Sequence, residues 1–402
     1  MIFRLAWRNI WRNKRRTWIL ISAISIGYFS LFIYMTVTEG AIRQVVENII
    51  DSGTGHIQIH KAGYLSDPEV KKSIKNPDEI LKILNFNEID MVTKRVNLQG
   101  VIYSPEETSP VRAIGGIPEK EKKLTKFTEY IVKGKFPEKE KEILIGSELE
   151  EILKVDLDDK VVLSCADKDG EISSFAFRVS GIFKSPSMEV NKFMVLTHIT
   201  AAEKIAGYKN EANEIVIRLK NDKSLKEVLE RTKKLIGSEY EVLSWEEIYP
   251  LIKYEFEIFR EMVLLFGLII FLGAVFGIMN VFYMSLFERM KEFGVLRAIG
   301  MKPLKLAKLI FAEGFLIGLI SIGIGFFLGL ILNTYLSVKG LNLSAFSKSL
   351  EIWGSGSIIY PYANFQTIIE LTLLIMGLVI FSVIFPARKA VKIIITEALR
   401  YV

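Results

Sequence analysis

The chain has 402 residues, of which 50% are hydrophobic and 24% are charged, with a net charge of +6 at pH 7. The single cysteine, Cys165, excludes an intramolecular disulfide; we expect it in a strand, buried or half-buried, and not as a catalytic thiol. Most of the basic excess borders apolar segments and forms no face interleaved with aromatic residues, so we expect no nucleic-acid partner.

Residues 1–16 predict an amphipathic helix that lies in the membrane interface on the cytoplasmic side. The apolar residues fall on one face at helical spacing, and the arginines fall on another, which would face anionic lipid. The alternative is a basic flank without fixed structure. The apolar set is Phe3, Trp7, Ile10 and Trp11, and the basic set is Arg4, Arg8, Arg12 and Arg15.

Residues 17–38 carry no charge and are long enough to cross a bilayer. The run is too long for the apolar region of a cleaved signal peptide, so it predicts an uncleaved anchor.

Residues 39–257 are mostly polar and predict a large α+β domain outside the membrane. Alternating apolar residues and the Asp169-Gly170 turn indicate strands, one pair of which forms a hairpin. Expected strands are Gly55–His60, Val161–Ala166, Ser174–Phe183, Asn191–Leu196 and Glu214–Leu219; expected helices are Pro77–Leu84, Glu148–Leu153 and Ser224–Ile236.

No catalytic, cofactor or metal site is expected in this chain. His56 and His60 share a strand face, but no third ligand accompanies them at an informative spacing. There is no nucleophile elbow and no Walker A pattern. We therefore expect a transport subunit and not an enzyme.

Three further spans are expected, at 258–287, 309–336 and 363–387. Lys and Arg gather in the segment 288–308 and in the tail 388–402, whereas the loop 337–362 carries only Lys339 and Lys348. The positive-inside rule then places both chain ends in the cytoplasm and residues 39–257 outside. Tyr360, Tyr362 and Phe365 are candidate interfacial anchors.

The spans contain glycines at four-residue spacing, which favours close packing of helices. Their most apolar parts, such as Gly314–Leu336, contain no ionisable residue, which argues against a proton- or ion-coupled transporter. The predicted packing residues are Gly273, Gly277, Gly314, Gly318, Gly325 and Gly329.

The segment Glu288–Pro303, ERMKEFGVLRAIGMKP, resembles the hallmark of the FtsX/MacB-type ABC transporter permeases. The tail, PARKAVK at 386–392 and EALRY at 397–401, is similar to the same family's C-terminal signature. The family usually has a proline two residues before that glutamate, where this chain has Ile395, so we expect the tail to continue as a helix.

The start of the chain, LAWRNIWRNKRR at 5–16, and GTGHIQIH at 53–60 resemble the lipoprotein-releasing LolC/LolE branch most. The resemblance implies four transmembrane helices, with a MacB-like periplasmic core inserted between the first two, in a bacterial inner membrane. It implies a permease that works by mechanotransmission with a separate ABC ATPase and with a second permease copy or paralogue. Membrane lipids, a lipoprotein substrate and a periplasmic chaperone are the further expected partners.

The segment after the second span is the expected ATPase-coupling site. Its glycines permit tight turns or close approach of backbones, its proline can open the next helix, and a short apolar knob flanked by basic residues could dock in a groove. The alternative is an ordinary loop held at the membrane surface. The predicted coupling residues are Glu292, Gly294, Val295, Leu296, Arg297, Ala298, Ile299, Gly300 and Pro303.

Release of lipoproteins from the inner membrane toward the outer membrane is the leading functional hypothesis. MacB-like export of a drug, peptide or toxin is the alternative within the family. Two other classes remain: an FtsX-like regulator of cell-wall hydrolases, and a ligand sensor, for which the chain lacks a cytoplasmic signalling domain.

Overall fold

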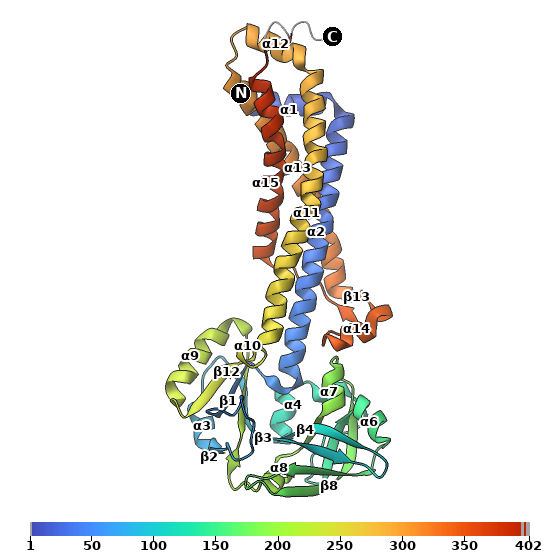
Figure 1. Ribbon diagram of the computed structural model, residues 1–402, viewed down its shortest axis with the longest axis vertical. Coiled ribbons are helices and arrows are strands. Elements are labelled where there is room, and N and C mark those ends of the chain that lie inside the picture. Colours follow the sequence, from blue (N-terminus) through green and yellow to red (C-terminus); the bar gives the residue numbers. More distant parts are fainter. Residues whose placement is uncertain (1, 395–397, 399–402) are drawn as a thin grey trace. The chain divides into compact units, whose positions relative to one another are not determined.

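The computed structural model describes residues 2–394 and 398, except for the side chains at 260, 263, 264, 270, 271, 274 and 348 (Figure 1). Its contacts divide it into two compact units. One comprises Met1–Ile42, Phe256–Leu341 and Ile359–Val402, and the other comprises Arg43–Glu255 and Asn342–Ile358. The loop expected at 337–362 therefore contributes most of its residues to the second unit.

The first unit is built from helices around one apolar core. These are α1 (Ile2–Arg12), α2 (Lys14–Ile49), α11 (Pro250–Glu288), α12 (Met290–Ala298), α13 (Pro303–Lys339) and α15 (Phe365–Val391). The core includes Ile24 and Phe32 of α2, Ile310 of α13 and Ile375 and Val379 of α15, all nearly fully buried. Such an interior suits helices whose backbone groups are satisfied within each helix.

The expected N-terminal helix at 1–16 is interrupted after Arg12, and α2 begins at Lys14. Its small and aliphatic residues Ala6 and Ile10 are buried against the bundle, whereas Phe3 is 60% exposed. Trp7 contacts Trp11 edge to face, with ring centroids 5.8 Å apart. The hydrophobic face is thus divided between a packed side and an exposed aromatic side.

Three of the described helical segments are long and apolar enough to span a membrane, namely Lys14–Thr54, Pro303–Lys339 and Phe365–Val391. The fourth expected span lies in α11, which is helical throughout Pro250–Glu288. Among the described residues of α11, the apolar stretch is Val275–Glu288, which is shorter than a span. Four spans therefore remain a proposal.

The helices extend well beyond the apolar segments that predicted them. The α2 helix continues past Thr38 to Ile49, and α11 begins at Pro250. Hydropathy marks the apolar part of a helix, whereas polar residues with helical propensity can prolong it.

Four of the six predicted packing glycines lie where helices approach closely. A methyl group on Gly314 would come within 2.5 Å of Val383, and one on Gly325 within 2.7 Å of the Ser25 carbonyl oxygen. Gly318 likewise faces Val379, and Gly329 faces Phe32. A methyl group on Gly273 or Gly277 would meet no atom within 4 Å among the described residues.

The second unit contains a ten-stranded mixed sheet in the order β12-β1-β11-β3-β4-β9-β6-β8-β5, with β7 paired to β3 and β8. The strands on this path and in the hairpin are β1 (Ile57–Lys61), β3 (Ile89–Tyr103), β4 (Thr108–Gly116), β5 (Ile131–Gly134), β6 (Glu142–Gly146), β7 (Lys160–Ala166), β8 (Ile172–Phe183), β9 (Met194–His198), β11 (Glu214–Leu219) and β12 (Tyr240–Ser244). Shorter strands are β2 (Ile74–Lys75), β10 (Glu211–Ala212), β13 (Leu341–Asn342) and β14 (Ile358–Ile359).

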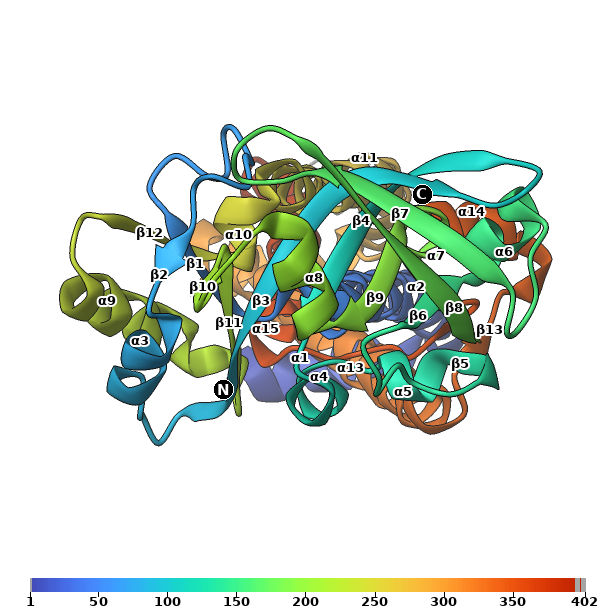
Figure 2. The ribbon, with the colours of Figure 1, turned by 90° about the horizontal axis from the view of Figure 1, so that it is seen from below.

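The second unit also contains helices, most of which cover this sheet or connect its strands. They are α3 (Pro77–Ile83), α4 (Pro118–Leu124), α5 (Phe127–Tyr130), α6 (Ser147–Leu153), α7 (Met188–Phe193), α8 (Ile199–Ala206), α9 (Leu225–Ile236), α10 (Trp245–Ile248) and α14 (Ser347–Ile352). Figure 2 shows α8 lying against β3 and β4, and α8 has buried residues in common with their core.

Strand β3 joins the two main hydrophobic cores of this unit. Its first part pairs with β11, in a core that includes Ile57, Ile215 and Val228. Its second part pairs with β4 and β7, in a core that includes Ile145 and Leu163. Arg95 lies where one pairing passes to the other.

Several local predictions for this domain are confirmed. The β7–β8 pair is antiparallel, and Gly170 in its turn has φ +86°. Cys165 is in β7 and 3% exposed, and burial raises its pKa to about 12. The helix predictions at Pro77, Glu148 and Ser224 correspond to α3, α6 and α9.

The prediction of a strand over Asn191–Leu196 is wrong in its first half. Residues Met188–Phe193 form α7, and the strand begins at Met194. The Ser187 side chain accepts a hydrogen bond from the Val190 amide, and Asn191 accepts one from the Ser185 amide with its side-chain oxygen, at 2.7 Å. These local bonds stabilise a helical turn that apolar alternation alone does not reveal.

Candidate functional site

The predicted coupling segment forms a short helix bounded by two breaks. Helix α12 begins at Met290, after Arg289 with φ −105°, and ends at Ala298. Gly300 then has φ +99°, a conformation that side chains other than glycine's adopt only with strain. Pro303 stands in the first turn of α13, as the sequence predicts.

Helix α12 has one buried side and one exposed side. Met290, Phe293 and Gly294 are buried, whereas Val295 is 49% exposed and Ile299, just after the helix, is 76% exposed. The predicted apolar knob is therefore divided: Leu296 packs against the bundle core, and Val295, Ala298 and Ile299 face outward. Exposed aliphatic side chains of this kind are available to a partner.

Arg297 is half-buried, and its Nη1 atom has no hydrogen-bond acceptor among the described residues. A buried guanidinium nitrogen without an acceptor is unfavourable. It lies beside the exposed aliphatic residues of α12.

A buried ion pair fastens the start of α12 to α13. Arg289 donates through Nη1 to both carboxylate oxygens of Glu313, at 2.9 and 3.0 Å, and both side chains are 8% exposed. Asn9 of α1 donates to the same carboxylate at 2.7 Å. The Arg289 guanidinium also lies over the Phe293 ring, 4.7 Å from its centroid. One carboxylate thus connects α1, α12 and α13.

Two exposed pairs add to this connection. Arg12 of α1 lies 2.8 Å from Glu292, and Arg16 of α2 lies 2.7 Å from Glu288. Burial acts to raise the pKa of Glu292, but its bonds to Arg12 and Arg289 prevail and lower it. Because both members of the Arg12–Glu292 pair are about half exposed, this pair contributes at most about 1 kcal/mol.

Sequence reasoning missed Asn9, Arg289 and Glu313 as site residues. Arg289 counted only as a topology signal, and Glu313 stands just before the apolar run Gly314–Leu336. A carboxylate at the edge of a span is a usable signal, because burial of such a group requires a partner. The interior of the helical unit therefore contains charge that the apolar cores did not predict.

A second polar cluster lies inside the second unit, which we also call the extracytoplasmic unit or outer domain, at the end of α2. There the chain leaves the helix through a π-helical turn, Ile50–Thr54, in which Gly53 has φ +111°. Arg95 of β3 donates to the Gly53 carbonyl oxygen. It also makes two bonds with Glu121 of α4, at 2.6 and 2.8 Å, and one with Glu214 of β11 at 3.2 Å.

This cluster joins the end of α2 to both cores of the unit. Arg95, Glu121 and Glu214 are each no more than 2% exposed. Burial acts to lower the pKa of Arg95, but the two glutamates prevail and raise it, so the guanidinium is charged at all ordinary pH values. Arg95 therefore contacts the turn that directly follows α2.

The two histidines do not converge on a common site. His56 lies 2.9 Å from Asp222, whereas His60 contacts the Asn213 carbonyl oxygen at 2.8 Å and stacks on Tyr64. Within the described part of the chain, no three His, Cys, Asp or Glu side chains gather as metal ligands would. The absence of a cofactor stays a prediction.

The tail signature at 397–401 and the helix expected through Ile395 lie outside the described residues. Before them, α15 ends at Val391.

Two family models match this chain. The MacB-like periplasmic core domain matches residues 17–235, and the FtsX-like permease C-terminal domain matches residues 264–395. The second match includes α12 and all of α13.

Whole-length relatives agree with these matches. An uncharacterized ABC transporter permease of Methanocaldococcus jannaschii is 24% identical, with 99% of this chain and 97% of the relative covered. The lipoprotein-releasing system transmembrane protein LolC of Neisseria meningitidis is 20% identical, with 96% and 94% covered.

A solved structure is similar to part of the chain. The periplasmic region of MacB from Actinobacillus actinomycetemcomitans has 12% sequence identity and a TM-score of 0.36, with 52% of this chain and 97% of that chain covered. The family matches and the apolar helices together establish that this chain belongs to the FtsX/MacB family of ABC transporter permeases and has LolC-like relatives.

Proposed function

We propose that this chain is the permease subunit of a mechanotransmission transporter whose ATPase is a separate polypeptide that docks on α12. The observation that carries the proposal is the arrangement of α12 itself. Its inner side is fixed to α1 and α13 through Glu313 and Arg289, while Val295 and Ile299 remain exposed. A segment held firmly on one side and exposed on the other suits the transfer of force from a partner.

The route of that force follows the chain. Helix α11 precedes α12 directly, and both α11 and α2 continue as helices into the segments that border the extracytoplasmic unit. At the end of α2, the Gly53 carbonyl oxygen accepts a bond from Arg95. Motion started at α12 would thereby reach the contact between the two cores of the outer domain. In this proposal the chain has four spans with both ends in the cytoplasm of a bacterial cell, and acts in a dimer with a second copy or a paralogue.

The proposed cargo is a lipoprotein, extracted from the inner membrane and passed to a periplasmic chaperone. Similarity to LolC over nearly the whole chain supports this cargo. Export of a drug, peptide or toxin is the alternative, and it is favoured by the match to the MacB-like periplasmic core. A regulator of wall hydrolases would use the same coupling segment.

The cargo is tested by depleting the protein and fractionating the membranes. Lipoprotein release predicts that outer-membrane lipoproteins accumulate in the inner membrane. Normal sorting after deletion of this gene and of any paralogue would contradict the proposed cargo, while leaving ATPase coupling intact.

Docking is tested by purifying the tagged permease with the ATPase that it retains. We expect Val295→Glu with Ile299→Glu to abolish co-purification, because charges would be placed in the apolar contact. The matched control is Ile172→Glu, a substitution of an 83% exposed isoleucine in the outer domain. Retention of the ATPase by the double variant would contradict docking on α12.

A further inference from the structure

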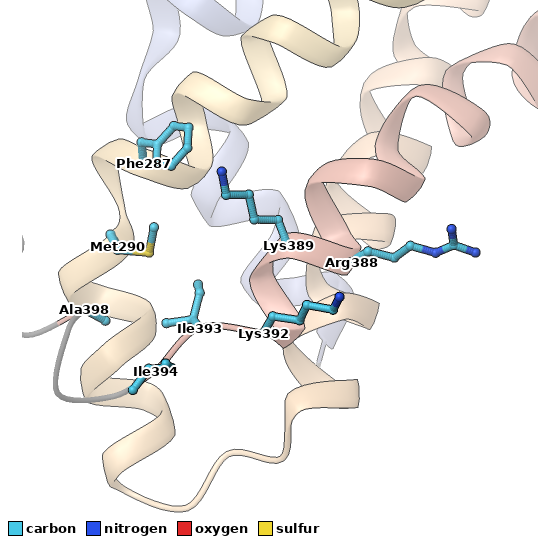
Figure 3. A pocket seen from close by; sticks show the side chains of 8 residues that line it. All are labelled: Phe287, Met290, Arg388, Lys389, Lys392, Ile393, Ile394 and Ala398. Atoms are coloured by element: carbon cyan, nitrogen blue, oxygen red, sulfur yellow. The ribbon is translucent and has the colours of Figure 1, made fainter.

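A pocket of about 590 Å³ lies between the end of α11 and the end of α15 (Figure 3). Its described lining divides into two chemical kinds. Basic residues come from the end of α15 and just after it, and apolar residues come from α11, α12 and the start of the tail. The lining consists of Arg388, Lys389, Lys392, Phe287, Met290, Ile393, Ile394 and Ala398.

The positive charge of this pocket is not compensated by the described residues. Among the described residues, the lining includes three cations and no carboxylate, and none of the three cations forms an ion pair with another described residue. By contrast, Arg12, Arg16 and Arg289 around α12 each pair with a glutamate. The pocket is therefore complementary to an anion.

One of the cations is held in place by aromatic rings. Lys389 places its Nζ atom 4.7 Å from the ring centroid of Phe287 and 5.8 Å from that of Tyr283. Figure 3 shows the Lys389 side chain directed toward Phe287. Cation–π contacts orient an ammonium group without neutralising it, so its charge remains available to a ligand.

The apolar part of the lining distinguishes between anions. Met290, Ile393 and Ile394 would contribute nothing to binding a free phosphate, but they would contact the glycerol backbone and upper acyl chain of a lipid. The pocket also lies at the ends of apolar helices, where headgroups are found. Basic pockets between membrane helices are known to bind anionic headgroups.

We propose that this pocket binds an anionic phospholipid, with the headgroup phosphate between Arg388, Lys389 and Lys392 and the chains against Met290 and Ile394. Met290 is the first residue of α12, so the bound lipid braces the coupling helix on the side opposite its exposed face. The site does not depend on the identity of the cargo.

The test measures lipid retained by the purified full-length chain in detergent, by native mass spectrometry with phosphatidylglycerol or zwitterionic phosphatidylcholine added. We expect phosphatidylglycerol to be retained preferentially. The triple variant Arg388→Gln, Lys389→Gln, Lys392→Gln should reduce that preference at least about ten-fold, since each basic residue near a headgroup contributes about five-fold.

The matched control, Lys209→Gln with Lys226→Gln and Lys234→Gln, removes the same charge from exposed residues of the outer domain that do not line the pocket, and should retain the lipid. A second variant, Ile394→Trp, keeps all three charges but fills the pocket, and should also weaken retention.

Three results would overturn the proposal. Equal loss of lipid retention in the control variant would indicate that the lipid responds to the net charge of the protein and not to this pocket. Displacement of the lipid by millimolar inorganic phosphate would indicate that the pocket binds a free anion. Unchanged lipid retention in the triple variant, together with loss of ATPase co-purification, would indicate that the pocket contacts the ATPase and does not bind a lipid. Because the lipid measurement needs no ATPase, its failure is distinguishable from failure of the docking proposal.

Discussion

Glu313 is the single side chain on which the arrangement of α12 depends most. Its carboxylate accepts bonds from both Arg289 and Asn9 inside an apolar core. Removing one member of a buried ion pair leaves an uncompensated charge, whereas replacing both members with apolar residues can be nearly neutral.

We therefore expect Glu313→Gln to lower the stability of the purified chain by about 3 kcal/mol. Glu313→Leu combined with Arg289→Met should restore much of this loss. Thermal unfolding in detergent measures both. A double variant as unstable as the sum of the single variants would show that the pair does not interact.

The buried position of His56 predicts that the stability of the outer domain depends on pH. Its Nδ1 accepts the Leu219 amide at 3.2 Å, so its Nε2 carries the proton that is donated to Asp222. Burial is the largest influence and lowers the pKa of His56 below the ordinary 6.5, although Asp222 opposes it. The folded state thus binds fewer protons than the unfolded state as pH falls below 6.5, and stability declines there.

Hydrogen exchange of β1 and β11 at pH 7.5 and pH 5.5 measures this effect. Protection should decrease at the lower pH in the wild type, and less in His56→Gln. An equal decrease in both proteins would assign the pH dependence to other groups.

Among the helices and strands, the sequence predicts mainly those features that depend on residues close together in the chain. Pro303 marks the start of α13, and Asp169-Gly170 marks the β7–β8 turn. The long partner strands β3 and β4 were not predicted, nor was the continuation of α2 to Ile49. The pairing of Arg289 with Glu313 depends on two segments that meet only in the folded bundle, so no local pattern reports it.

A substitution of Gly300 tests whether coupling to ATP turnover requires the turn between α12 and α13. The Gly300 φ of +99° strains any side chain, although a methyl group there would meet no atom of the described residues within 4 Å. We expect Gly300→Ala to cost about 1–2 kcal/mol in this turn and to reduce ATP turnover that depends on the permease. Gly323→Ala is the matched control, because a methyl group at this helical position contacts no described residue, and it should retain turnover. Equal turnover in both variants would contradict a role for the turn.

Close helix packing makes a separate prediction for Gly325. A methyl group there would lie 2.7 Å from the Ser25 carbonyl oxygen, whereas one at Gly277 would meet no atom of the described residues within 4 Å. Gly325→Ala should therefore destabilise the helical unit by about 1–3 kcal/mol, while Gly277→Ala should not. Unfolding temperatures in detergent distinguish the two variants, and a stable Gly325→Ala protein would contradict the close α2–α13 approach.

For the whole molecule, the proposed mechanism requires the end of α2 to act on the outer domain through Arg95. Arg95→Lys keeps the charge but cannot reproduce the paired bonds to Glu121 and the bond to Gly53. We expect a loss of about 1–3 kcal/mol from unsatisfied buried acceptors, with ATP hydrolysis retained and cargo release lost. A reconstituted complex that releases cargo normally with this variant would contradict the proposed route.

The central claim, that α12 docks on a separate ATPase, is tested most directly by site-specific photo-crosslinking in living cells. A photoreactive residue at Ile299 should form an adduct with an ATP-binding protein, identified by mass spectrometry, and one at Ile172 of the outer domain, which is slightly more exposed, should not. Failure of position 299 to capture an ATP-binding protein, or equal capture from position 172, would contradict the claim.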